Sequence, residues 1–90
     1  MQPNYRWPTP KGDLTIEKDN EHPWLWDLCF NGAPLRKGYT DPDKAAWEAN
    51  QSDVGDEKIN SFLRNFFAPS DLRQWMQMPA RTFQNSNQNN

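Results

Sequence analysis

The sequence lacks most of the motifs from which a chemical function can be predicted. Its one cysteine, Cys29, excludes a disulfide within the chain and therefore a disulfide-stapled secreted domain. No stretch approaches the roughly 18 apolar residues of a membrane-spanning helix. The N-terminal residues hold no apolar run of the kind found in signal peptides. We therefore expect a protein of the reducing cytoplasm that does not enter a membrane.

Metal, phosphate and nucleophile motifs are missing as well. The one histidine, His22, forms no zinc signature with Cys29, and about 23 Å would separate the two along an extended strand. The four glycines are scattered, so the chain has no glycine-rich phosphate loop. Acidic residues between positions 41 and 57 offer oxygen ligands, but the EF-hand pattern is absent, and capping and solvation explain these acids more simply. We predict no enzyme activity, no cofactor and no metal.

Aromatic side chains, by contrast, are plentiful, because the 90 residues include five Trp, two Tyr and five Phe. Each aromatic side chain buries roughly 150–250 Å², so a few of them can build the core of a short chain. The formal net charge of −2 argues against a general nucleic-acid binder, which needs a basic face to neutralise phosphates. Acids gather in residues 41–60, where there are six of them and two bases. We expect one small domain with an aromatic core and an acidic segment.

The segment 24–39 predicts a β-hairpin around which the fold is organised. At its centre, Asn31-Gly32 is the dipeptide that best tolerates the two positive φ angles of a type I′ turn. The predicted strands cover about 24–31 and 33–39. Three pairs, apolar or aromatic, then share one face of the ribbon: Phe30 with Ala33, Leu28 with Leu35, and Trp24 with Tyr39.

A third strand is predicted over 13–20, where Leu14 and Ile16 alternate with polar residues. The three strands form an antiparallel meander. Pro34 cannot donate a hydrogen bond to a neighbouring strand, so the last strand should lie at an edge of the sheet. The same register places Arg36 opposite Asp27 and predicts a cross-strand ion pair on the second face.

Two to three helices follow, at about 42–51, 56–67 and 70–78. Asp41 and Asp56 are predicted N-caps, and Pro42 suits a first helical position. In the first helix, alanines allow a close approach to the sheet, and Trp47 is predicted as its one large buried side chain. The fold class is therefore α+β, with the helices packed on the aromatic face of the meander.

The two ends of the chain differ from this domain of residues 13–79. Residues 1–12 hold three prolines and predict an extended arm; its Tyr5 and Trp7 either strap across the core or form an interaction surface. Residues 80–90 are polar and predict a disordered tail.

No motif identifies a function, and two hypotheses remain. The first is a small non-enzymatic regulatory protein, of inhibitor or adaptor type, that acts on a protein partner as a monomer or homodimer. Its candidate partner-binding residues are Tyr5, Arg6, Trp7, Asp27, Arg36, Asp41, Asp43, Glu48, Asp53, Asp56 and Glu57. The alternative is a nucleic-acid-associated accessory protein that uses Arg36, Lys37 and the C-terminal arginines Arg64, Arg73 and Arg81.

Overall fold

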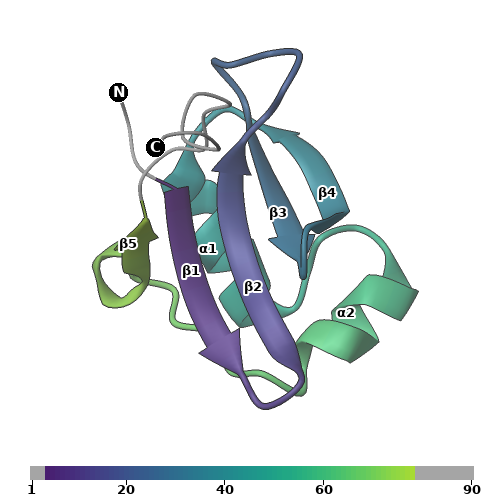
Figure 1. The fold of residues 1–90 in the computed structure, drawn as a ribbon. Coiled ribbons are helices and arrows are strands. Elements are labelled where there is room, and N and C mark those ends of the chain that lie inside the picture. Colours follow the sequence, from purple (N-terminus) through teal and green to yellow (C-terminus); the bar gives the residue numbers. More distant parts are fainter. Residues whose placement is uncertain (1–3, 79–90) are drawn as a thin grey trace.

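The computed structural model describes residues 4–78 of the chain. A five-stranded antiparallel sheet in the order β4-β3-β2-β1-β5 packs against two α-helices and a short 3₁₀ helix (Figure 1). The elements, in chain order, are β1 Asn4–Thr9, β2 Gly12–Lys18, β3 Trp26–Phe30, β4 Ala33–Tyr39, α1 Pro42–Gln51, α2 Glu57–Leu63, η1 Leu72–Gln74 and β5 Met76–Met78.

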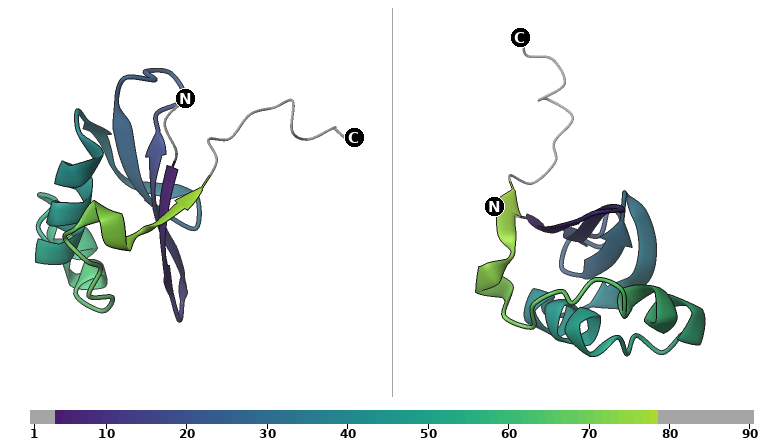
Figure 2. Two further views of the ribbon diagram at one scale, coloured as in Figure 1. Left: turned by 90° about the vertical axis from the view of Figure 1, so that its left-hand side faces the viewer. Right: turned by 90° about the horizontal axis from the view of Figure 1, so that it is seen from below.

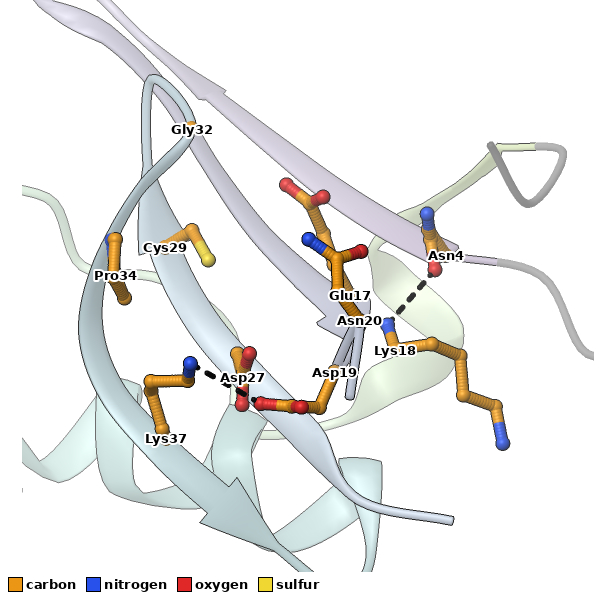
Figure 3. Close-up of a pocket in the computed structure, with 10 residues that line it drawn as sticks. All are labelled: Asn4, Glu17, Lys18, Asp19, Asn20, Asp27, Cys29, Gly32, Pro34 and Lys37. Carbon is orange, nitrogen blue, oxygen red and sulfur yellow. Dashed lines mark hydrogen bonds and ion pairs between the residues drawn. The ribbon is translucent and has the colours of Figure 1, made fainter. Parts of the chain in front are cut away.

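The helices lie on one face of the sheet (Figure 2). Within the described residues, no helix covers the other face, which we call the open face. This arrangement explains the alternation along β2, where Leu14 and Ile16 are fully buried under the helices. Glu17 points to the open face, and Thr15, whose hydroxyl donates to Glu17, lies on the same face (Figure 3).

The predicted three-stranded meander is wrong, because the sheet has five strands. The predicted strands correspond to β2, β3 and β4, but residues of the expected N-terminal arm form β1 and pair with β2. Strand β5 then pairs with β1, from Asn4 opposite Met78 to Arg6 opposite Met76. Prolines exclude a regular helix but not an extended strand. The segment around Tyr5 and Trp7 could therefore enter the sheet and turn both side chains towards the core.

The third predicted helix, over 70–78, is also wrong. Asp71 caps only the three-residue helix η1, and Trp75 then takes an extended backbone with φ −81° and ψ 149°. The buried Trp75 ring donates from Nε1 to the carbonyl oxygen of Pro69 at 2.8 Å. Pairing of Met76–Met78 with β1 is favoured over the helix that the spacing of apolar residues in 70–78 predicted. A helical backbone is also disfavoured at Met78 because a proline follows it. The second helix, predicted to reach Phe67, ends at Leu63.

The hairpin turn is confirmed, since Asn31 and Gly32 have φ angles of 50° and 86°. Its register is right only beside the turn, where Phe30 faces Ala33 and Cys29 faces Pro34. Beyond that the pairing is shifted. Leu28 faces Arg36 where Leu35 was predicted, and Tyr39 faces Trp26 where Trp24 was predicted. The expected edge position of β4 is confirmed.

The core lies between the sheet and the helices. Ala45, Ala46 and Ala49 of α1 are fully buried or nearly so and contact the sheet closely, as predicted. Asp41, Pro42 and Asp56 begin the two helices as expected. Two aromatic predictions fail: Trp24 precedes β3 and is 65% exposed, and Trp47 lies on the outer side of α1. The core does contain Tyr39, as predicted, and the rings of Trp26 and Trp75.

Candidate functional site

A β-bulge in the β3–β4 pair decides which basic residue faces the open side of the sheet. The pair has two register shifts, and the one between Cys29 and Leu28 adds one residue to β4, which reverses the alternation of its side chains at Arg36. Arg36 therefore lies on the helical side, where Nη1 donates to the carbonyl oxygen of Val54 at 2.5 Å and lies 3.7 Å from Oε1 of Glu48. The predicted Asp27–Arg36 ion pair is thus wrong, and Lys37 occupies the open face beside Asp27 (Figure 3).

The open face is hollowed between β2, β3 and β4. The hollow has a volume of about 330 Å³. Its lining includes the side chains of Asn4, Glu17, Asp19, Asp27, Cys29 and Lys37 (Figure 3). Cys29 is buried, as expected for a cysteine in the middle of a strand, and its sulfur points into the hollow.

Two buried carboxyl groups lie at the bottom of this hollow. Asp19 is 5% exposed and Asp27 is 8% exposed, and their carboxyl groups hydrogen-bond to each other. Burial raises the pKa of Asp27, and Asp19 raises it further as hydrogen-bond partner and as a like charge. Since two carboxylates at hydrogen-bond distance repel each other, the pair takes up its first proton on Asp27, the group whose pKa is raised.

Asp19 stays ionised because several groups donate to it. Burial opposes the charge, but the backbone amides of Glu21 and His22 each donate to Oδ1 at 2.9 Å. Asp27 adds a hydrogen bond, and Nζ of Lys37 lies 3.4 Å from Oδ2. Together these contacts lower the pKa of Asp19 far below its ordinary value, and Asp19 in turn raises the pKa of Lys37.

A second surface of interest lies on the helices. Phe67, after α2, is 84% exposed, and Trp47 of α1 is 49% exposed. Nδ2 of Asn50, one helical turn from Trp47, donates to the carbonyl oxygen of Ala68 at 2.9 Å. Because residues three apart on a helix are neighbours, this hydrogen bond brings the segment with Phe67 close to the Trp47 side of α1. We call the exposed side chains of residues 41–67 the helical surface.

Apart from Asp27 on the open face, the predicted acidic residues lie in residues 41–67; Glu48 is only 13% exposed, and several of the others have structural partners. Asp41 and Asp56 accept hydrogen bonds from backbone amides of the first helical turns. Glu57 binds Arg64 at 2.9 Å, and Glu48 accepts from the Tyr39 hydroxyl at 2.8 Å. The remaining two acids, Asp43 and Asp53, are also exposed.

The remaining predicted residues are spread over both faces of the sheet. Tyr5 and Trp7 lie partly buried against the core on the helical side. Arg6 pairs with Asp13 at 2.9 Å. The sequence reasoning missed Asp19, Trp47 and Phe67 as surface or site residues, and it named Lys37 only for the nucleic-acid alternative. For Phe67 a signal existed, since it lies outside the apolar positions Ile59, Phe62, Leu63 and Phe66 of the helix predicted over 56–67.

Nothing in the described chain indicates a metal or a membrane. Residues 4–78 contain no group of three or more His, Cys, Asp or Glu side chains placed to hold a metal ion. Neither described helix is long and apolar enough to cross a membrane. Comparison with protein families, curated proteins and solved structures finds no match to this chain.

Proposed function

We propose that this chain is a small non-enzymatic binding protein, of inhibitor or adaptor type, that engages a protein partner through its helical surface. The observation that carries the proposal is the state of Phe67. Its ring is 84% exposed, and its backbone has a φ of 51°, in the left-handed region that bulky residues avoid.

Both properties of Phe67 are unfavourable in the isolated protein. The left-handed backbone costs a non-glycine residue about 1–2 kcal/mol. A phenylalanine left in water also forgoes about 1.5–3 kcal/mol of burial energy. Strained backbone that the surrounding structure holds in place is typical of binding sites. A partner that covers Phe67 and the nearby Trp47 would recover the burial energy, and aromatic anchors of this kind dominate interface energies.

The charge of the helical surface supports a basic partner. Residues 41–67 carry six acidic and three basic side chains, whereas the rest of the chain carries six acidic and seven basic ones. The excess negative charge of the protein thus belongs to the segment that also exposes Trp47 and Phe67. Complementary charge steers association and excludes wrong partners. The partner surface is therefore basic, with an apolar socket for the two aromatic side chains.

The arginines of the nucleic-acid alternative are engaged with acids where the structure describes them. Arg36 lies near Glu48, Arg64 binds Glu57, and Arg73 binds Asp71. The other arginine of that hypothesis, Arg81, and the predicted tail 80–90 lie outside the described residues. We therefore propose no nucleic-acid function and treat nucleic-acid binding as an outcome of the test.

We place the protein in the cytoplasm as part of the same proposal. Its single cysteine, buried in β3, is compatible with a reducing compartment.

A site-specific photocrosslinking experiment tests the proposal. A photoreactive phenylalanine analogue replaces Phe67 in the full chain, and a matched variant carries it at Lys11, an exposed residue in the β1–β2 turn. Crosslinking in an extract of the native host should yield a partner at position 67 that is absent at position 11. Identification of this partner then allows binding measurements with purified proteins.

With the purified partner, Phe67→Ala should weaken binding at least tenfold, as expected of an interface hot spot. Binding should also weaken as salt rises, because opposite charges meet. Lys11→Ala is the control and should bind as the unchanged protein does. Equal affinity of Phe67→Ala and the unchanged protein would refute the proposal, as would a tight, salt-dependent mobility shift of DNA or RNA.

A further inference from the structure

The two carboxyl groups in the hollow connect parts of the chain that are otherwise separate. Asp19 directly follows β2 and holds the β2–β3 loop, residues 19–25, through the amides of Glu21 and His22. Asp27 lies in β3, and its Oδ1 accepts from the backbone amide of Gly38 in edge strand β4 at 3.2 Å. The hydrogen bond between the carboxyl groups therefore links the loop to the edge strand, beside the ion pair of Asp19 with Lys37 of the same strand (Figure 3).

The loop held in this way carries an exposed aromatic residue. The Trp24 ring is 65% exposed and stacks edge-on against the His22 ring, with a centroid distance of 5.2 Å. His22 is itself held by Asp19, through its amide and through Nδ1 at 3.4 Å. The position of Trp24 on the surface therefore depends on the contacts that Asp19 makes.

We propose that the Asp19–Asp27 pair is a proton-held latch: the proton that the two carboxyl groups share keeps the Trp24 loop attached to β4, and its loss loosens the loop. The latch goes beyond the proposed partner binding, since it concerns the open face and not the helical surface. When Asp27 loses its proton, two buried carboxylates repel each other at hydrogen-bond distance. The repulsion acts on the link between the loop and the edge strand.

The ionisable groups around the Asp19–Asp27 pair do not supply one cation for each carboxylate. Lys37 of β4 is paired with Asp19 at 3.4 Å. The other ionisable groups around the hollow are Glu17 and Lys18 of β2, Cys29 of β3, and Glu21 and His22 of the loop. Nζ of Lys18 is bound to the carbonyl oxygen of Pro23 at 2.8 Å. Strand β1 contributes the uncharged Asn4. One ammonium group therefore faces two carboxyl groups at the centre of the hollow, so a second negative charge there lacks a matching cation among these neighbours.

The direction of the pH dependence follows from Asp27. Its pKa in the folded protein is raised above the ordinary value of 3.8, chiefly by burial and then by Asp19. A raised pKa means that the folded state holds this proton more tightly than the unfolded state does. The latch is therefore complete at low pH and is lost as pH rises through the folded pKa of Asp27. Asp19, whose pKa is lowered, remains ionised throughout.

A pH titration of the full chain by NMR tests this latch. The side-chain carboxyl carbons report the protonation of Asp19 and Asp27, and amide exchange, expressed as protection factors, reports the loop and β4. The carboxyl signal of Asp27 should titrate above 3.8. The protection of the Glu21, His22 and Gly38 amides should fall at least tenfold around the same midpoint.

Two variants separate the latch from other titrations. Asp27→Asn keeps a donor for Asp19 and an acceptor for Gly38 without a titrating proton, so protection should stay high across the pH range. His22→Gln removes the imidazole that contacts Asp19, and the fall in protection should persist. A third variant, Lys37→Met, removes a charge that lowers the pKa of Asp27, so the midpoint should move to higher pH.

Three results would overturn the latch. The first is titration of Asp27 with no change in amide protection. The second is a fall in protection that survives in Asp27→Asn, and the third is its disappearance in His22→Gln. If Asp27→Asn does not fold, the direction of the shift in Lys37→Met still decides, because a midpoint that stays in place or moves to lower pH contradicts the proposal.

Discussion

The guanidinium of Arg36 donates a hydrogen bond from Nη1 to the carbonyl oxygen of Val54 at 2.5 Å, and this contact ties edge strand β4 to the loop between the two helices. Val54 is only 3% exposed, so its carbonyl group has little access to water as an alternative partner. The β-bulge makes the contact possible, because it directs Arg36 towards the helices.

Replacing Arg36 with Met should therefore destabilise the protein. The variant loses the hydrogen bond to Val54 and the ion pair with Glu48, and it leaves a buried carbonyl without its donor. Because the Arg36 side chain is 46% exposed, we expect a loss of about 1 kcal/mol and not the larger value of a fully buried pair. Urea unfolding measures the change. The control Lys58→Met, at an exposed position of α2, should stay within about 0.5 kcal/mol of the unchanged protein.

Glycine at position 67 should make the protein more stable. Glycine adopts the left-handed backbone of Phe67 without strain, and a ring that is 84% exposed contributes little packing to lose. We expect Phe67→Gly to raise the free energy of unfolding by about 1 kcal/mol. The neighbouring Phe66→Ala is the matched contrast, because this ring packs against Phe30 and Phe62 and should cost about 3 kcal/mol.

The combination of stability and binding makes the Phe67 experiment decisive. If Phe67 lowers the stability of the protein but contributes to binding, the Phe67→Gly variant should be more stable than the unchanged protein and should bind the partner more weakly. A variant that loses stability would show that the Phe67 ring packs within the protein, contrary to its exposure.

Tyr39 should produce a stability difference that depends on alkaline pH. Burial raises the pKa of Tyr39, and its hydrogen bond to Glu48 raises the pKa further, so the neutral phenol is the form that the fold stabilises. That stabilisation is present below the ordinary pKa of 10.0 and is lost as pH rises beyond it. Tyr39→Phe should be about 1 kcal/mol less stable at neutral pH. The gap should narrow above pH 10, as measured by urea unfolding of both proteins across this range. A gap that stays constant there would contradict this prediction.

Replacing Gly12 with alanine should destabilise the protein, because the new side chain would meet Asn31 in the β3–β4 turn. A Cβ atom at Gly12 would lie 2.4 Å from the side chain of Asn31, whose Oδ1 accepts from the Asp13 amide at 2.9 Å. To make room, Asn31 must give up this hydrogen bond. Gly12→Ala should therefore cost about 1 kcal/mol more than Gly32→Ala, where φ is also positive but no atom lies within 4 Å of the new Cβ. In an Asn31→Ala background the additional cost should largely disappear, and its persistence would point to backbone strain.

The parts of the fold that the sequence predicted well depend on chemistry between neighbours in the chain. Asn31-Gly32 forms the turn because these two residues tolerate positive φ angles. Asp41 and Asp56 cap helices because their carboxylates reach amides two residues ahead. The buried side of β2 follows from its alternation of side chains. Each of these signals is contained in a few consecutive residues.

The candidate sites were harder to predict, because they depend on one residue of register. A bulge in β4 places Lys37, and not Arg36, on the open face, and the spacing of residues in the sequence does not predict this bulge. Asp19 lies at the end of a strand, where its carboxylate meets Asp27 and Lys37 from two other strands. Charge counting alone could not bring these three groups together.

The sequence by itself therefore determined an α+β domain, its central hairpin turn, its helix starts and most of its buried aliphatic residues. Only the tertiary structure decided that five strands form the sheet, since β1 and β5 meet across nearly the whole chain, from Asn4 to Met78. The tertiary structure also decided that Trp26 is buried while Trp24 and Trp47 remain at the surface. The reason is physical: turns and caps are stabilised by adjacent backbone groups, whereas register and exposure depend on packing between segments far apart in sequence.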